Sequence, residues 1–228
     1  MSRQLIMTRD GSHSVGISGT DTTYHSRHGA MQESLHIFIQ AGLSPLLTKK
    51  MRLRIFEMGL GTGLNALLTL AACREANQAV YYETIETHPL EQEIISALNY
   101  CRQLNQPALQ ESFDRIHACV WEEETMIDSL FCLKKNRIGL LEHRLEGEFD
   151  LVYFDAFAPG DQPELWTAEV FAKLYSAMSD QGVLVTYSSK GSVQRNLRSA
   201  GFSLLKLPGP PGKREILKAS KHGPHDAG

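Results

Sequence analysis

Short, continuous apolar runs alternate along most of this chain with segments whose apolar residues recur at helical spacing. A strand buried on both faces is apolar throughout, whereas one face of a helix repeats every three to four residues. Strands are therefore predicted at residues 53–58, 80–85, 115–120, 150–154 and 182–187. Helices are predicted at residues 29–41, 64–72, 89–98, 163–178 and 192–200. This alternation predicts an α/β fold with a doubly wound, mainly parallel sheet and a ligand site at the carboxyl ends of its strands.

Two apolar runs near the C-terminus break the alternation. Residues 202–207 and 215–219 flank the segment Pro208–Gly212, with no helix between them. Adjacent strands joined in this way are antiparallel, so the last strand is expected to run against the others. Residues 121–149 lack a clear period, and we predict a loop there with one short strand at 131–134.

The first fifty residues differ from the rest. Residues 5–8 and 15–17 predict two short strands joined by a turn. The helix at 29–41 is expected to end at Gly42 and Pro45, because both residue types interrupt helices.

The length of 228 residues and the hydrophobic share of 42% are typical of a soluble globular protein. We divide the chain into an N-terminal extension at 1–50, a main domain at 51–220 and a disordered tail at 221–228. This composition excludes collagen-like and wholly disordered chains.

The net charge of −3 is unevenly distributed. Residues 1–183 hold 15 Lys+Arg and 24 Asp+Glu, whereas residues 184–228 hold 8 and 2. The chain is therefore not a uniformly basic nucleic-acid binder, but its C-terminal part has room for a local basic surface.

The cysteines Cys73, Cys101, Cys119 and Cys132 form no Cys-x-x-Cys pair, and we expect four buried, reduced thiols. No His, Cys or acidic residues have the spacing of metal ligands, so no metal is expected. The N-terminus does not have the pattern of a signal peptide, and no apolar stretch is long enough to span a membrane. A cytoplasmic protein is the expectation.

A glycine-rich segment, Glu57-Met58-Gly59-Leu60-Gly61-Thr62-Gly63-Leu64-Asn65, follows a predicted strand and opens a predicted helix. Glycines let the backbone approach a ligand, and the helix N-terminus favours an anionic group. A dinucleotide fingerprint has its third glycine where this chain has Leu64. The spacing G-x-G-x-G favours a nucleoside cofactor without a pyrophosphate, such as S-adenosylmethionine. The alternative is a tight turn that binds nothing.

Two carboxylates follow predicted strands and extend this interpretation. Glu86 ends the strand after the glycine-rich segment, where a carboxylate can accept hydrogen bonds from both ribose hydroxyls. Asp155 ends the 150–154 strand, where it could orient an amine and accept its proton, with Phe157 in an apolar wall beside it. The alternatives are a solvated strand end for Glu86 and a helix cap for Asp155.

Several segments together resemble the MnmC-type methyltransferase domain. The specific ones are Tyr153–Pro159 (YFDAFAP), Pro163–Thr167 (PELWT) and Pro208–Glu215 (PGPPGKRE). The glycine-rich segment, Ala200-Gly201-Phe202 and the N-terminal stretch Tyr24–Gly29 with Glu33-Ser34 also resemble that family. The similarity covers residues 5–219.

The resemblance implies a class I S-adenosylmethionine-dependent methyltransferase fold, with seven strands and an antiparallel last strand. It also implies methylation of the aminomethyl group on a wobble uridine of tRNA, giving 5-methylaminomethyl-2-thiouridine by direct SN2 transfer. The chain is too short for the flavin-dependent oxidase domain of some members, so the stand-alone type (MnmD) is implied. The implied partner is tRNA, with neither a membrane nor a metal, and no oligomeric state is specified.

The resemblance also assigns roles to individual residues. Those implied to line the cofactor are Glu57, Gly59, Gly61, Thr62, Gly63 and Asn65, with Glu86 on the ribose and Asp155 facing both cofactor and amine. Candidate substrate residues are Tyr24, Glu33, Phe157, Ser188, Lys213 and Arg214. The chain departs from the common pattern because residues 136–141 offer no acidic residue for the adenine amino group. Trp121, Glu122 or a backbone group could replace it.

Two other functions remain open at this point. One is a methyltransferase or aminopropyltransferase that acts on a small amine. The other is a non-catalytic nucleoside-binding or scaffold module.

Overall fold

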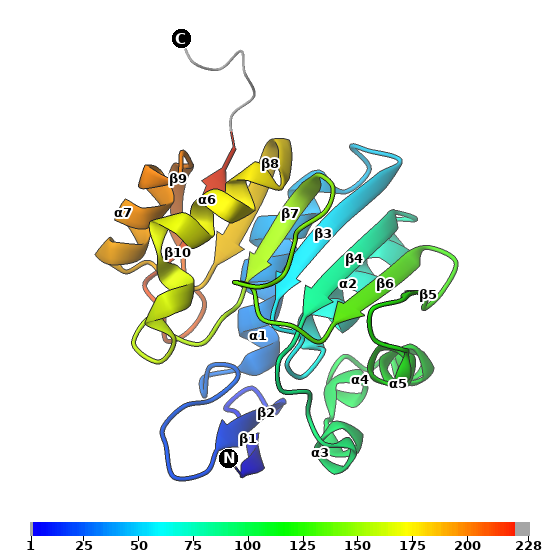
Figure 1. The fold of residues 1–228 in the computed structure, drawn as a ribbon. Coiled ribbons are helices and arrows are strands. Elements are labelled where there is room, and N and C mark those ends of the chain that lie inside the picture. The colour runs from blue at the N-terminus through cyan, green and yellow to red at the C-terminus, as the bar shows by residue number, and fades with distance from the viewer. Residues whose placement is uncertain (1, 222–228) are drawn as a thin grey trace.

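The structure is a computed structural model that describes residues 2–221. Its centre is an eight-stranded sheet in the order β5-β6-β4-β3-β7-β8-β10-β9 (Figure 1). The parallel strands are β3 (Arg52–Met58), β4 (Ala79–Ile85), β6 (Phe131–Asn136), β7 (Phe149–Phe154) and β8 (Met178–Thr186). The antiparallel last strand is confirmed, because β10 (Glu215–Ser220) pairs antiparallel with both β8 and β9 (Ser203–Pro208). A short antiparallel edge strand, β5 (Glu124–Met126), adds one strand to the predicted seven.

Helices cover both faces of the sheet, as predicted for a doubly wound fold. Successive residues of β3 point to opposite faces of the sheet and belong to different hydrophobic clusters. Ile55 is in the cluster that contains residues of α2 (Leu64–Glu75), and Phe56 is in the cluster that contains residues of α6 (Ala168–Ser176). The remaining helices are α3 (Gln92–Ala97), α4 (Tyr100–Gln103), α5 (Gln110–Ala118) and α7 (Gly191–Ser199). Pro163–Trp166 forms a separate 3₁₀ turn before α6 instead of the start of one long helix.

The N-terminal strands β1 (Arg3–Met7) and β2 (His13–Ile17) form the predicted antiparallel pair as a separate small sheet. Helix α1 (Ala30–Ser34) continues into a π-helical segment, η1 (Leu35–Leu43). The prediction that Gly42 ends the helix is wrong. A Cβ there would lie 3.0 Å from Cγ2 of Val185, so glycine lets η1 lie close against β8.

The predicted strand at 115–120 is also wrong, because helix α5 occupies Gln110–Ala118. Phe113 and Ile116 lie one helical turn apart and are both buried, and this is the spacing of an amphipathic helix. The third parallel strand is β6, two residues longer than the short strand predicted at 131–134. Its Lys135 is fully buried, and its ammonium group donates a hydrogen bond to the carbonyl of His117.

Other features agree with the sequence or differ in detail. The four cysteines are free thiols, three of them buried and Cys119 half-buried. Helix α3 begins at Gln92, three residues after the predicted start at Pro89. The predicted tail lies outside the described residues, apart from Lys221. The division into an extension and a main domain stays a prediction.

Candidate active site

The carboxyl ends of the parallel strands bring three predicted site residues to one edge of the sheet. Glu57 is the penultimate residue of β3, Glu86 follows β4 and Asp155 follows β7. Strands β4 and β7 lie on opposite sides of β3. In open α/β sheets ligands bind at such a switch point, so the topology itself places the candidate site here.

The loop between β3 and α2 has a backbone that glycine adopts most readily. Left-handed φ angles of 87°, 52° and 73° occur at Gly59, Gly61 and Gly63. The N–H of Gly61 donates to Oε2 of Glu86 at 3.0 Å, which ties the loop to the end of β4. The glycine loop and Glu86, predicted separately from the sequence, are therefore in direct contact.

The carboxylate of Glu86 can still accept hydrogen bonds from a ligand. Its second oxygen, Oε1, accepts a hydrogen bond from the N–H of His88 at 2.8 Å. Each carboxylate oxygen has two acceptor positions, so both can still accept a hydroxyl. Two fixed backbone donors thus orient the carboxylate for a vicinal diol.

Buried polar atoms without partners lie around the glycine loop. Both carboxyl oxygens of Glu57, the hydroxyl of Thr62 and Oδ1 of Asn65 lack a hydrogen bond within the described residues. Burial raises the pKa of Glu57 well above its usual range, and the nearby charge of Asp155 acts in the same direction. Buried polar groups are normally satisfied, so this cluster indicates the place of a polar ligand.

Asp155 is half-buried and fixed by Asn65, whose Nδ2 donates to its Oδ2 at 3.0 Å. Burial raises the pKa of Asp155 to about 7, and the charge of Glu33 adds to this effect. The hydrogen bond from Asn65 and the charge of Lys213 act in the opposite direction. A carboxyl that titrates near neutral pH can both orient an amine and exchange a proton with it.

Two candidate substrate residues, Tyr24 and Phe157, form an aromatic pair over the glycine loop. Their rings meet edge to face with centroids 5.2 Å apart. A Cβ at Gly61 would lie 3.1 Å from Cδ1 of Tyr24, so the tyrosine ring rests against the loop. Burial raises the pKa of Tyr24 to about 12. The pair forms an apolar wall beside Asp155.

Glu33 and Lys213 also come together, from the two ends of the chain. The ammonium nitrogen of Lys213 lies 3.0 Å from Oε2 of Glu33 and 4.1 Å from the ring centroid of Tyr187. The other oxygen of Glu33 accepts the N–H of Ser26 at 3.1 Å. Because Glu33 pairs with it directly, the charge of Lys213 is largely compensated within the protein.

The remaining candidates differ in exposure. Ser188 is buried directly after Tyr187 at the end of β8. Arg214 is exposed on the C-terminal hairpin. The structure therefore brings Glu33 and Lys213 close to Asp155 and pairs Tyr24 with Phe157, whereas Ser188 is buried and Arg214 is exposed.

Sequence reasoning missed two residues at this site. The hydroxyl of Tyr187 donates to the carbonyl of Ala156 at 2.9 Å, next to Asp155. Nε2 of His117 lies 3.2 Å from the carbonyl oxygen of Thr62 and would lie 2.7 Å from a Cβ at Gly63. Tyr187 is the last residue of the strand predicted at 182–187 and follows β8 directly, so that position could have identified it. His117 was missed because its segment was predicted as a strand at 115–120 and is helix α5.

Trp121 and Glu122, two of the alternatives for the adenine contact, lie beside the end of β6. Trp121 pairs with Lys135 in an isolated bridge, and the ammonium group of Lys135 lies 4.6 Å from its ring centroid. Oε1 of Glu122 accepts the N–H of Arg137 at 2.9 Å. Both residues therefore flank the third parallel strand.

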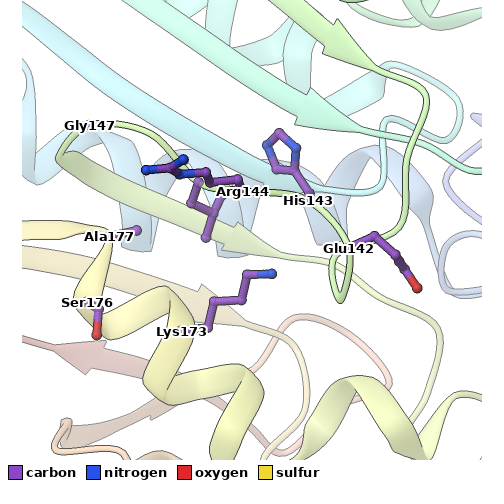
Figure 2. Close-up of a pocket in the computed structure, with 8 residues that line it drawn as sticks. Glu142, His143, Arg144, Gly147, Lys173, Ser176 and Ala177 are labelled. Carbon is purple, nitrogen blue, oxygen red and sulfur yellow. The ribbon is translucent and has the colours of Figure 1, made fainter.

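A separate open cavity of about 420 Å³ lies away from this edge, near the amino ends of β7 and β8 (Figure 2). Two of its polar side chains, His143 and Lys173, already have partners in the protein. Nε2 of His143 lies 2.9 Å from Oε1 of Glu83, and the ammonium group of Lys173 donates to the carbonyls of Leu140 and Leu141. This cavity is not part of the candidate site.

Within residues 2–221, no helix is long and apolar enough to cross a membrane. The same part of the chain holds no group of three or more His, Cys, Asp or Glu side chains arranged for a metal ion.

Comparisons with known proteins agree with this geometry. Residues 99–222 match a family described as S-adenosyl-L-methionine-dependent methyltransferase. The chain is 30% identical over 210 residues to the tRNA 5-methylaminomethyl-2-thiouridine biosynthesis bifunctional protein MnmC of Azoarcus sp. (strain BH72). That match covers 86% of this chain and 32% of the relative, so the chain spans about a third of the length of the curated relatives it matches.

Solved structures show the same fold. The crystal structure of MNMC2 from Aquifex aeolicus superposes with a TM-score of 0.80 and 25% identity, over 98% of this chain and 72% of that chain. Spermidine synthase from Thermotoga maritima superposes with a TM-score of 0.60 and 12% identity, over 96% of this chain and 68% of that chain, which shows the fold alone. The predicted class I fold and the resemblance to MnmC-type proteins are both confirmed.

The unpartnered groups fit the cofactor of this family. S-adenosylmethionine carries an ammonium and a carboxylate at one end and a ribose diol in the middle. Within residues 2–221, no hydrogen bond is made by the carboxyl of Glu57, Oδ1 of Asn65 or the hydroxyl of Thr62. Glu86 presents an oriented carboxylate for the diol. The chain belongs to the S-adenosyl-L-methionine-dependent methyltransferases and uses S-adenosylmethionine as its cofactor.

Proposed function

We propose that this chain methylates the aminomethyl group of a wobble uridine in tRNA, converting 5-aminomethyl-2-thiouridine into 5-methylaminomethyl-2-thiouridine. The substrate is taken from the relatives, whose names place them in the biosynthesis of this nucleoside. A tRNA substrate would place the chain in the cytoplasm.

The environment of Asp155 is the observation that carries the proposal. Its carboxyl follows β7 beside the glycine loop, is held by Asn65, and has its pKa raised to about 7. A primary amine is mostly protonated at neutral pH, whereas methylation requires a free nitrogen lone pair. A fixed carboxylate next to the cofactor meets this need, because it can hold the nitrogen and accept its proton.

The bound cofactor supplies an electrophilic methyl group on a sulfonium centre. An in-line transfer from that sulfur would require the amine nitrogen to be held, unprotonated, opposite the S–C bond that would break. Positioning contributes much of the rate in such a step, and Asp155 and Asn65 provide it for the nitrogen. Tyr24 and Phe157 exclude water from one side of the amine.

The cofactor roles follow from the unpartnered atoms described above. We assign Glu57, Thr62 and Asn65 to the amino-acid end and Glu86 to the ribose, with the glycines letting the ligand approach the backbone. Trp121 and Glu122 flank the place expected for adenine.

A labelled-methyl transfer assay tests the proposal with three acceptors: tRNA bearing aminomethyluridine, unmodified tRNA, and free polyamines. We expect label only in the aminomethyl tRNA, and its loss in Asp155→Asn. Label in polyamines alone would favour a small-amine enzyme. Cofactor binding without label in any acceptor would favour a non-catalytic module.

A further inference from the structure

The turn of the C-terminal hairpin packs against the segment that leads into α1. A Cβ added at Gly212 would collide with the ring of His28. Nδ1 of His28 lies 3.2 Å from a guanidinium nitrogen of Arg9, and the N–H of Arg9 donates to the carbonyl of Arg27 at 3.1 Å. Parts of the chain almost two hundred residues apart therefore form one continuous surface.

This surface carries uncompensated positive charge. Arg9, Arg27 and Arg214 are exposed, and within residues 2–221 none of their guanidinium groups belongs to an ion pair. We call the four residues Arg9, Arg27, His28 and Arg214 the basic rim.

Two acidic side chains of the same segments, Asp10 and Glu33, are engaged within the protein, whereas Asp21 is exposed. Asp10 accepts hydrogen bonds from the hydroxyl of Thr8 at 2.7 Å and from the N–H of Gln32 at 3.0 Å. Glu33 is paired with Lys213. Asp10 and Glu33 therefore do not pair with the three arginines of the basic rim, which are exposed.

The basic rim borders the candidate active site. Lys213 lies between Gly212 and Arg214, and it pairs with Glu33. Both Lys213 and Glu33 lie close enough to Asp155 to change the pKa of its carboxyl. A polyanion held on the basic rim would therefore lie next to the amine-binding carboxylate.

We propose that the basic rim binds the phosphate backbone of the RNA that carries the target nucleoside. Guanidinium groups suit phosphate because they present several N–H donors in a fixed plane. Such contacts set the position of the nucleic acid without reading its sequence. This inference rests on the proposed function, because a small amine would need no phosphate contacts.

The test is the salt dependence of binding to an unmodified anticodon stem–loop RNA, measured by fluorescence anisotropy. It compares the wild type with the triple variant Arg9→Ala, Arg27→Ala, Arg214→Ala. The matched control is Arg144→Ala, an exposed arginine near the amino ends of β7 and β8. We expect the triple variant to bind at least about tenfold more weakly, with the slope of log K against log salt reduced by about 2.

Two results would overturn the basic rim: unchanged affinity and slope in the triple variant, or an equal loss in Arg144→Ala. Circular dichroism and cofactor titration of each variant show whether the fold and the cofactor site are intact. Methyl transfer is scored separately. If the wild type methylates aminomethyl tRNA and the triple variant binds RNA normally, the proposed RNA-binding role of the basic rim is wrong and the proposed methylation of tRNA is supported. If the wild type is inactive on every tRNA and the triple variant shows the predicted loss of RNA binding, the RNA-binding role of the basic rim is supported and the proposed methylation of tRNA is wrong.

Discussion

The ammonium group of Lys213 lies 3.0 Å from Oε2 of Glu33, and the two side chains have opposite effects on the pKa of Asp155. The pair joins the C-terminal hairpin to the N-terminal helix beside the carboxyl of Asp155. Because the two charges oppose each other at Asp155, removal of either one should change the pKa of its carboxyl.

The first prediction concerns the pH dependence of methyl transfer. The rate should rise with pH through an apparent pKa near 7, because Asp155 must be ionised to accept a proton. Glu33→Gln leaves the positive Lys213 unbalanced and should move this apparent pKa down. Lys213→Met leaves Glu33 unbalanced and should move it up. Rate–pH profiles of the three proteins provide the measurement, and shifts in the same direction would contradict this account.

Asp155→Asn should lower the methyl-transfer rate by about 10² to 10⁴-fold while leaving cofactor binding intact. The amide keeps the size of the carboxylate but cannot accept a proton. Single-turnover rates measure the first effect, and calorimetric titration with the cofactor measures the second. A fully active, folded Asp155→Asn enzyme would contradict the assigned role.

The same substitution should change the pH dependence of stability. The carboxyl of Asp155 has a pKa of about 7 in the folded protein, against about 3.9 in an unfolded chain. Its ionisation therefore opposes folding, so the contribution of this carboxyl to stability is greatest below about pH 4 and is lost as the pH rises through 7. Asp155→Asn should melt a few degrees above the wild type at pH 8 and at the same temperature at pH 4. Differential scanning calorimetry provides both values, and an equal difference at both pH values would exclude this cause.

Gly63→Ala should destabilise the fold by about 1–3 kcal/mol. The residue has a φ of 73°, and an added Cβ would lie 2.7 Å from Nε2 of His117. Gly160→Ala is the matched control, since a Cβ there meets no atom within 4 Å. Urea unfolding of both variants distinguishes this effect from a general effect of alanine, which would shift the two midpoints equally.

Glu86→Gln should weaken cofactor binding by about tenfold or more, because a charged acceptor for the ribose diol is lost. Glu93→Gln changes an exposed carboxylate on the neighbouring helix α3 and should leave the affinity unchanged. Isothermal titration calorimetry compares the two variants. Equal affinity in Glu86→Gln and the wild type would remove Glu86 from the site.

The alternation of apolar runs predicted the sheet and its switch point, because buried parallel strands have a strong sequence signal. It failed between residues 107 and 136. The segment 115–120 looks like a strand when its apolar residues are counted in sequence, whereas Phe113 and Ile116 pack as one helical face. The end of strand β6 was missed because Lys135 is buried there with a backbone carbonyl as its partner.

The candidate site was predictable where a residue follows a strand or forms a loop with left-handed glycines, as Glu86, Asp155 and Gly61 do. Contacts between segments far apart in the sequence could not be predicted, because they produce no local sequence pattern. The pairing of Glu33 with Lys213 and the packing of His28 on Gly212 depend on the contact of the α1 region with the turn between β9 and β10. Such contacts arise from tertiary packing alone.

The most direct measurement of the central claim is mass spectrometry of nucleosides from tRNA after incubation with this chain and S-adenosylmethionine. The starting tRNA carries 5-aminomethyl-2-thiouridine. We expect the wild type to convert it to 5-methylaminomethyl-2-thiouridine and Asp155→Asn not to do so. Unchanged 5-aminomethyl-2-thiouridine after treatment with folded, cofactor-binding wild type would contradict it.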